Sequence, residues 1–405
     1  MKWITITSIK LPGGQKGITV PMIKIVIPFS FSFFKTNKDK KMRMFDFFKR
    51  QLHKEEKSKS PIVVFTQPTD QYFTWQVHLY IENCISVGFD AEKIHVLLYN
   101  PAGRPPNKNW EKLAKLYPKV KFFNYPDKGV REYLGLYIPI LRPHILWQHF
   151  EANPWLKDET ILYTDCDILW MRIESIRKLF DDDCCYVSDA KSYLNVSYFD
   201  SKLKDVIPDK LEAYKQRDIV KELCDIVGIE RSVAVENNDN TGGVQYILKN
   251  VDAEFWKKIE KDVISIRKHL LAVNKEFFES ENKGIQSWCA DLWALQYNLW
   301  KKGCCKTVPE MEFAWVHDPI SKLERVNIYH NAGATGTHTV IGKDKDGNEI
   351  KYPIFYKGKY HQGSNPFKDT HLDDVLYNEE TKKHCTWYYA SKLAELRQKY
   401  IIDYI

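Results

Sequence analysis

The chain has 405 residues, of which 44% are hydrophobic, 14% aromatic and 28% charged, and its formal net charge is +7. This composition excludes a disordered chain, a coiled coil, a collagen-like repeat and a polytopic membrane protein. The length is compatible with a single large α/β enzyme.

The positive charge is concentrated at the N-terminus. Residues 1–60 hold 14 basic and 4 acidic side chains, a net charge of +10, whereas the other 345 residues have a net charge of −3. We therefore expect a basic N-terminal arm that contacts a polyanion or a membrane surface. Residues 25–34 are largely apolar, as in a signal sequence, but Pro28 interrupts them and no small-residue cleavage site follows. They are also shorter than the roughly 20 residues that span a bilayer. Membrane anchoring or export is therefore the less favoured alternative, and a natural start at Met42 or Met44 is another.

The nine cysteines form no C-x-x-C pair. Their odd number and two adjacent Cys-Cys pairs argue against both a disulfide framework and a zinc knuckle. This pattern favours a reducing compartment, and hence a cytoplasmic location.

From residue 61 the sequence alternates between short apolar strands and amphipathic helices. We predict strands at 61–67, 93–99, 120–123, 160–164, 184–188, 241–248 and 328–330, and helices at 72–87, 110–116, 137–150, 253–271, 285–300 and 372–400. Pro143 predicts a kink or a nearby helix start, and residues 189–236 are expected to be irregular. Such alternation predicts an α/β fold with a mostly parallel central sheet flanked by helices, which binds ligands at the carboxyl ends of its strands.

Asp-x-Asp occurs three times, and only Asp165/Asp167 follows an apolar strand. Asp181/Asp183 lies in an acidic run, and residues 344–347 are typical of a hairpin turn. In an extended segment residues i and i+2 point to the same side, so the first pair of carboxylates converges. Mg²⁺ or Mn²⁺ bound there would keep positions for water and for the phosphate oxygens of a diphosphate leaving group. Two aspartates that cap the next segment are the alternative.

Several motifs follow one another in a characteristic order: Thr66-Gln67 at the end of the first strand, 161–170 with Asp165 and Asp167, 240–246, 288–293, and 328–331. In this order they resemble the GT-A glycosyltransferases, metal-dependent enzymes that move a sugar from a nucleoside diphosphate to a hydroxyl. Within that family the chain looks most like the plant and algal transferases that act on serine or hydroxyproline, and like virus- and phage-encoded glycosyltransferases. The resemblance covers roughly residues 61–370. It implies a GT-A domain at 61–370, between the basic arm at 1–60 and a helical C-terminal extension at 371–405.

The resemblance implies roles for individual residues on the donor side. Asp165 would face the ribose and the metal, and Asp167 would coordinate the metal beneath the diphosphate. His330 would be an additional metal ligand, with an ordinary strand-end histidine as the alternative. Gly242 and Gly243 would let the backbone approach the donor sugar, or would only form a bulge or tight turn.

Asp291 is the candidate catalytic carboxylate. In inverting enzymes of this family an acidic residue at a helix start takes the acceptor's proton. The alternatives are a carboxylate favoured by the helix dipole, and a sugar-positioning group in a retaining enzyme. Arg142 and Lys359, the latter in the basic loop 357–363, would contact the nucleotide and the diphosphate. Thr66 and Gln67 would face the nucleotide base.

We therefore predict a hexosyl- or pentosyltransferase that uses a UDP- or GDP-sugar and Mn²⁺ or Mg²⁺. The acceptor would be a hydroxylated base in DNA, with the basic arm tracking the phosphates, or a protein or glycan hydroxyl. A non-catalytic nucleotide-sugar or polyanion binding protein is one alternative. A sugar nucleotidyltransferase is another, although its glycine-rich phosphate loop is missing after the first strand. The signatures of P-loop kinases, Rossmann dehydrogenases, zincins and α/β-hydrolases are absent from the sequence.

Overall fold

The computed structural model describes residues 60–101, 108–134, 137–280, 283–333, 336–343 and 346–400. The chain divides into two units, Met1–Lys57 and Ser58–Ile405. The first unit lies outside the described residues, so the basic N-terminal arm stays a prediction. All that follows concerns the second unit.

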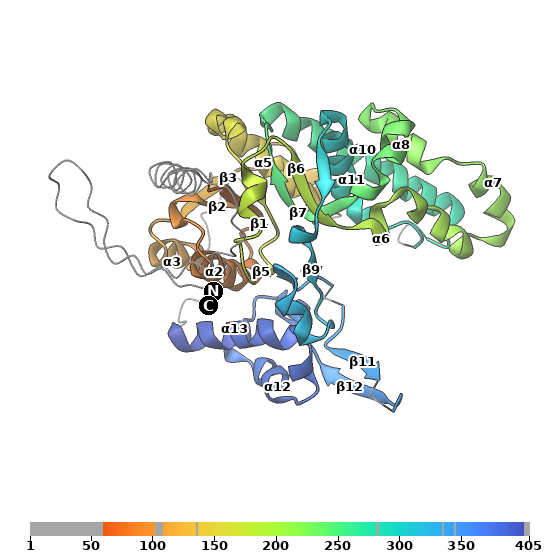
Figure 1. Ribbon diagram of the computed structural model, residues 1–405. Helices are drawn as coiled ribbons and strands as arrows, with labels where there is room; N and C mark the ends of the chain where they lie inside the picture. Colours follow the sequence, from red (N-terminus) through yellow and green to blue (C-terminus); the bar gives the residue numbers. More distant parts are fainter. Residues whose placement is uncertain are drawn as a thin grey trace, which may run out of the picture. The chain divides into compact units, whose positions relative to one another are not determined.

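A seven-stranded sheet forms the centre of this unit (Figure 1). In spatial order its strands are β3 (Lys121–Tyr125), β2 (Ile94–Tyr99), β1 (Ile62–Pro68), β4 (Ile161–Tyr163), β7 (Gly242–Leu248), β6 (Cys185–Asp189) and β8 (Cys305–Thr307). The first four are parallel, β7 is antiparallel to both β4 and β6, and β6 and β8 are parallel. The predicted α/β fold with a mostly parallel sheet is confirmed.

The sheet is buried on both faces, as the continuous apolar strands require. Alternate residues of β1 enter different hydrophobic clusters, because successive side chains of a strand point to opposite faces. Val63 and Phe65 pack with one cluster, and Ile62 and Val64 pack with the other.

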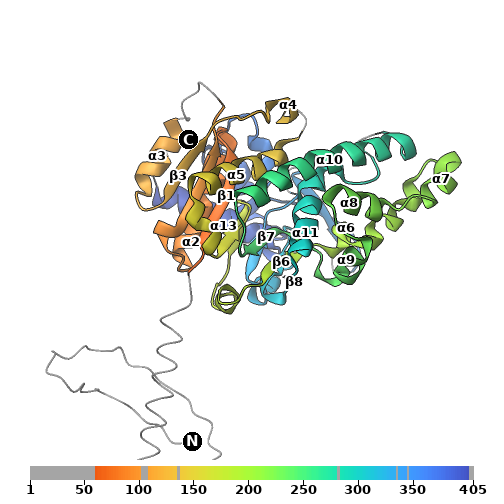
Figure 2. The ribbon, with the colours of Figure 1, turned by 90° about the horizontal axis from the view of Figure 1, so that it is seen from above.

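Different helices cover the two faces. The first cluster includes buried side chains of α2 (Gln71–Ser86), α3 (Lys108–Leu116) and α13 (Cys385–Lys399), and the second includes those of α5 (Leu141–Ala152), α10 (Ala253–Phe277) and α11 (Ala290–Lys302). Figure 2 shows α5 and α10 lying over the strands. The remaining α-helices are α4 (Arg131–Leu134), α6 (Lys191–Leu194), α7 (Leu211–Lys215), α8 (Ile219–Val227), α9 (Arg231–Glu236) and α12 (His371–Tyr377).

Two smaller sheets complete the unit. One has the order β5 (Ile168–Trp170), β10 (Ile328–His330) and β9 (Phe313–Ala314), and the other is the hairpin of β11 (Thr339–Lys343) and β12 (Glu349–Pro353). The hairpin predicted around residues 344–347 is thus confirmed by its two strands, although residues 344 and 345 lie outside the described part.

Several helices differ from their predicted limits for local reasons. The helix predicted at 137–150 begins as a 3-10 turn and continues as α5 from Leu141, with Pro143 in its first turn, where a missing N–H costs no hydrogen bond. The segment expected to be irregular contains α6 to α9. Within it, Asp218 caps α8 by accepting from the Lys221 N–H, and Gly228 ends that helix at φ 77°.

Cys184 and Cys304 form a disulfide with a Cα–Cα distance of 5.0 Å. Each precedes a strand, and β6 and β8 are neighbours in register at Cys185 and Cys305, so the residues before the two strands are neighbours as well. Cys185 and Cys305 belong to the second hydrophobic cluster, whereas Cys184 belongs to the first. The prediction against disulfides is wrong for this pair, while the other seven cysteines are free and buried. The compartment stays a prediction. No described helix is both long and apolar enough to cross a membrane.

Gly242 is required by packing. A Cβ at this position would lie 2.3 Å from Ser188 O and from a methyl carbon of Val187, whereas a Cβ at Gly243 would meet Tyr246 Oη at 3.2 Å. We expect Gly242→Ala to lower the free energy of unfolding by about 3 kcal/mol, since neither the backbone carbonyl nor the β-branched side chain can retreat freely. Gly243→Ala, the matched control, should change it by less than about 1 kcal/mol. Equal urea midpoints for the two variants would contradict this account.

Candidate metal and nucleotide site

The segment Asp165-Cys166-Asp167 connects two sheets. β4 of the central sheet ends at Tyr163, and β5 of the three-stranded sheet begins at Ile168. The hydroxyl of Tyr80 on α2 hydrogen-bonds Thr164 Oγ1 at 2.6 Å, which fixes the start of the segment. The two carboxylates therefore lie at the carboxyl end of a parallel strand, where such sheets bind ligands.

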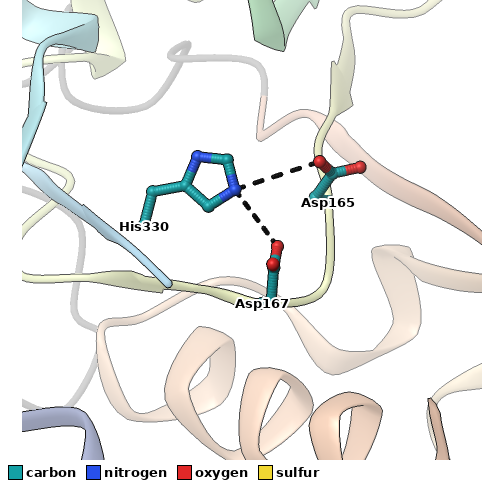
Figure 3. Close-up of side chains that lie close together, drawn as sticks. All are labelled: Asp165, Asp167 and His330. Atoms are coloured by element: carbon teal, nitrogen blue, oxygen red, sulfur yellow. Dashed lines mark ion pairs between the residues drawn. The ribbon is translucent and has the colours of Figure 1, made fainter. Parts of the chain in front are cut away.

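His330 reaches this segment through strand pairing. β10 runs antiparallel to β5 with His330 opposite Ile168, and the Asn331 N–H donates to Asp167 O at 2.9 Å. This register directs the imidazole of His330 toward both carboxylates (Figure 3).

The three side chains form a compact donor set. His330 Nε2 lies 3.2 Å from Asp167 Oδ1 and 4.0 Å from Asp165 Oδ2. One potential ligand atom from each residue lies within 4.8 Å of the others. Asp167 Oδ1 is buried and accepts no hydrogen bond within the described chain. Two carboxylate oxygens and one imidazole nitrogen are suitable ligands for Mn²⁺ or Mg²⁺ and leave positions for phosphate oxygens.

Lys357 adds a cation to the cluster. It belongs to the 3-10 turn Lys357–Tyr360, its side chain is buried, and its ammonium donates to Asp167 Oδ2. Burial alone would raise the pKa of Asp167, but the charges of Lys357 and His330 hold it well below its usual value. For Asp165, burial raises the pKa against the opposing effect of Arg142. Asp167 is thus the more firmly ionised carboxylate.

Arg142 links this cluster to Asp291. Its Nη2 donates to Asp165 Oδ1 at 2.8 Å, and its Nη1 donates to Asp291 Oδ2 at 2.7 Å. Burial would lower the pKa of Arg142, but the two carboxylates raise it well above its ordinary value. Arg142 comes from the first turn of α5 and Asp291 from the first turn of α11, so the link joins two helices to the end of β4.

Tyr137 holds the other side of Asp291. Its hydroxyl lies 2.9 Å from Asp291 Oδ1 and 2.8 Å from Trp288 O, either of which can accept its proton, and it accepts from the Asp291 N–H at 3.0 Å. Both carboxylate oxygens of Asp291 therefore have a donor within reach, and each keeps a further lone pair.

A hollow lies on the Arg142 side of the carboxylates. Its lining includes Asp165 and Asp291 but neither Asp167 nor His330. Val244 lines it at φ 74°, a region that a β-branched residue occupies only under strain of about 1–3 kcal/mol. Strained backbone of this kind clusters at ligand-binding sites, which supports a binding role for the start of β7.

Other predicted residues lie at or near this edge of the sheet. Thr66 and Gln67 are buried at the carboxyl end of β1, which pairs with β4 up to Tyr163. Gly242 and Gly243 open β7 directly before Val244. The packing around Gly242 explains that glycine without any ligand.

The side chains of Lys357 and Lys359 contact different carboxylates. The Lys359 ammonium forms an ion pair with Asp369 at 2.7 Å, and its side chain is 41% exposed. Lys357, which shares the predicted basic loop, is the lysine that contacts Asp167. The predicted contact of Lys359 with the diphosphate stays a prediction, and the contact of Lys357 with Asp167 was not predicted, because the 3-10 turn sets the direction of each side chain.

Gln245 lies beside the Nδ1 atom of His330. Its Nε2 lies 3.4 Å from His330 Nδ1, and its Oε1 accepts from Ser188 Oγ at 2.7 Å. A histidine that binds a metal through Nε2 must carry its proton on Nδ1. Turning the Gln245 amide by 180° would let its oxygen accept that proton while its nitrogen donates to Ser188. No sequence motif indicated that Gln245 would contact His330.

Comparison with known proteins gives structural matches alone. No family model and no curated protein matches the sequence. Among solved structures, the chain is similar to the bifunctional glycosyltransferase WbbM, with 10% identity and a TM-score of 0.37 over 83% of this chain and 52% of WbbM. The chain thus spans about half the length of WbbM.

Two further solved structures are similar. Mouse xyloside xylosyltransferase 1 has 10% identity and a TM-score of 0.34, over 68% of this chain and 98% of that one. The mannosyltransferase PcManGT from Pyrobaculum calidifontis, solved with GDP-Man and Mn²⁺, has 12% identity and a TM-score of 0.25, over 59% of this chain and 73% of that one. All three are glycosyltransferases, the class that the motifs resemble. With TM-scores below 0.5, these likenesses carry no argument about the ligands of this chain.

We predict that Gln245→Leu lowers the affinity for Mn²⁺ by about 10- to 100-fold, because His330 loses the group that can hold its Nδ1 proton. Gln245→Glu should retain the affinity, since a carboxylate accepts that proton directly. Mn²⁺ titration followed by electron paramagnetic resonance measures this without any assay of activity. Wild-type affinity in the folded leucine variant would exclude the role.

Proposed function

We propose that this chain is a metal-dependent glycosyltransferase that moves a sugar from a nucleoside-diphosphate donor to a hydroxyl acceptor. The observation that carries the proposal is the cluster of Asp165, Asp167 and His330 at the carboxyl end of β4, with the buried Lys357 beside it. These three side chains would hold Mn²⁺ or Mg²⁺, which when bound would neutralise charge developing on the diphosphate leaving group.

Other residues of the chain would bind and orient the donor and the catalytic carboxylates. Lys357 would bind the diphosphate oxygens and stabilise the departing negative charge. Arg142 orients Asp165 and Asp291 through its two ion pairs. Thr66 and Gln67 would contact the base of a UDP or GDP donor, and the strained start of β7 would contact the donor sugar.

Asp291 is proposed as the base. The acceptor oxygen forms a bond to C1 of the donor sugar, the bond from C1 to the diphosphate oxygen breaks, and the acceptor proton passes to the carboxylate of Asp291. The Arg142 and Tyr137 contacts support this role, because they hold the carboxylate in one orientation while lone pairs remain available.

The acceptor is a hydroxyl of a glycan or protein, or a hydroxylated base in DNA. The DNA alternative depends on the basic arm at residues 1–60, because the rest of the chain has a net charge of −3. A non-catalytic nucleotide-sugar binding protein is the competing function. Such a protein would release no nucleotide from any donor.

We expect UDP- or GDP-sugars with Mn²⁺ to raise the melting temperature and to release nucleotide slowly without an acceptor. Asp167→Asn should abolish the Mn²⁺-dependent part of both effects, lowering turnover by about 10³-fold, since a neutral amide replaces a charged ligand. Asp183→Asn is the matched control, because Asp183 belongs to the exposed second Asp-x-Asp pair. Full Mn²⁺-dependent turnover in Asp167→Asn would refute the metal assignment.

For the base, we expect Asp291→Asn to lower kcat by about 10²- to 10⁴-fold with little change in donor affinity. The anomeric configuration of the product, read by NMR, should be inverted relative to the donor. Retention of configuration would instead make Asp291 a positioning residue.

A further inference from the structure

One sequence motif has no part in the proposed function: Asn195-Val196-Ser197, an Asn-x-Ser sequon. The chain contains no other Asn-x-Ser or Asn-x-Thr sequence. In chains that pass through an oxidising secretory compartment, the asparagine of such a sequon accepts an N-linked glycan. A motif of three residues also arises by chance, so a functional sequon needs a suitable place in the fold and independent evidence for that compartment.

The sequon lies in a break between two short helical elements. Asn195 follows α6 with an extended backbone, at φ −74° and ψ 169°, and precedes the 3-10 turn Val196–Tyr198. The buried side chains of Leu194 and Tyr198 anchor the segment on both sides. Between them Ser197 is exposed and Asn195 is half-buried. The fold therefore fixes this backbone by apolar contacts on either side of the two polar side chains.

The amide nitrogen that would carry the glycan is available. Ser197 Oγ donates to Asn195 Oδ1 at 3.2 Å, so the carbonyl side of the amide is engaged within the sequon. Asn195 Nδ2 donates to no described residue, and it is not one of the buried polar atoms that lack a partner, so it is open to solvent. Replacing one of its protons by a sugar breaks no hydrogen bond of the fold.

The cysteines supply the independent evidence for an oxidising compartment. Cys184 and Cys304 form a disulfide, a bond that persists mainly in such compartments. All nine cysteines belong to the described residues, and Cys304 is the one that is exposed. The seven free cysteines are buried, so no free thiol is accessible to an oxidant.

This arrangement removes the argument for a cytoplasmic location. That location was predicted from a cysteine pattern that argued against disulfides, and the Cys184–Cys304 pair contradicts the argument. The sequence leaves export open, because residues 25–34 are largely apolar and follow basic residues, as in a signal sequence.

We propose that Asn195 carries an N-linked glycan and that the chain folds in an oxidising secretory compartment. Asn195 Nδ2 forms a bond to C1 of a sugar, the bond from C1 to the diphosphate of a lipid-linked oligosaccharide breaks, and one amide proton is lost to a base. The thiols of Cys184 and Cys304 lose two electrons and two protons to a protein disulfide, which is reduced to two thiols. The proposal is independent of the proposed function, because none of these residues belongs to the metal cluster or lines the hollow.

Expression of the full chain in insect cells tests the proposal. One form begins at Met1, and a second has a cleavable secretory signal placed before Met1. Mass spectrometry of the first form should find the tryptic peptide 192–202 glycosylated, and peptide N-glycosidase F should remove the glycan and leave an aspartate at position 195. Alkylation without a reductant should leave Cys184 and Cys304 unlabelled.

Variants within one peptide provide the controls. Asn195→Gln and Ser197→Ala should each lose the glycan completely, whereas Ser197→Thr should keep it, because threonine also completes the sequon. Ser201→Ala, in the same peptide but outside the sequon, should keep it as well. Melting temperatures establish that each variant is folded.

Three results would overturn the proposal. An unmodified Asn195 in both forms would exclude the glycosylation site. A glycan in the second form alone would exclude the compartment, because the chain would then reach it only through the added signal. Alkylation of Cys304 in the unreduced first form would exclude the disulfide that supports this compartment.

Discussion

The double ion pair of Arg142 is the interaction on which the arrangement of the site depends. One planar guanidinium donates to Asp165 at the end of β4 and to Asp291 at the start of α11. A lysine could not replace it, because a point charge on a flexible stem does not orient two carboxylates in one plane. Removing the guanidinium would take from Asp165 and Asp291 the cation that they share, and losing a charged partner at a buried site is destabilising. Asp165 of the candidate metal cluster and Asp291 are thus joined through one side chain.

Charge balance imposes a second constraint. Lys357 contacts Asp167, and a divalent cation held by Asp165, Asp167 and His330 would have the same sign of charge as this lysine. The Asp167 carboxylate lies between the two, and under the proposed function a diphosphate would add further negative charge there. Metal and donor would then each make the site more favourable for the other.

The parts of the site that could be predicted from sequence are those that local patterns determine. Asp165 and Asp167 follow an apolar strand, and the carboxyl ends of parallel strands form ligand sites, so their place could be derived directly. The partnership of Lys357 with Asp167 could not, because it depends on a 3-10 turn that selects one lysine of a basic loop. The Arg142–Asp291 pair joins residues 149 positions apart, and nothing in either local sequence indicates the other. Asp218 and Gly228 are residue types that commonly begin and end helices. The sequence therefore does contain a signal for α8, although residues 189–236 are predicted to be irregular.

The disulfide follows the same reasoning. The sequence alone does not show which cysteines are neighbours in space, and nine cysteines with no regular spacing argue against disulfide pairing. Once β6 and β8 are neighbours in parallel register, the residues before each strand must also be neighbours. Cys184 and Cys304 then lie within bridging distance, which composition alone cannot reveal.

The distribution of charge bears on what the site can recognise. The net charge of +10 belongs to residues 1–60, and the other residues have a net charge of −3. Residues 61–405 therefore have no surplus of positive charge that would attract a polyanion over a long range, so a polyanion would have to be bound through local groups or through residues 1–60.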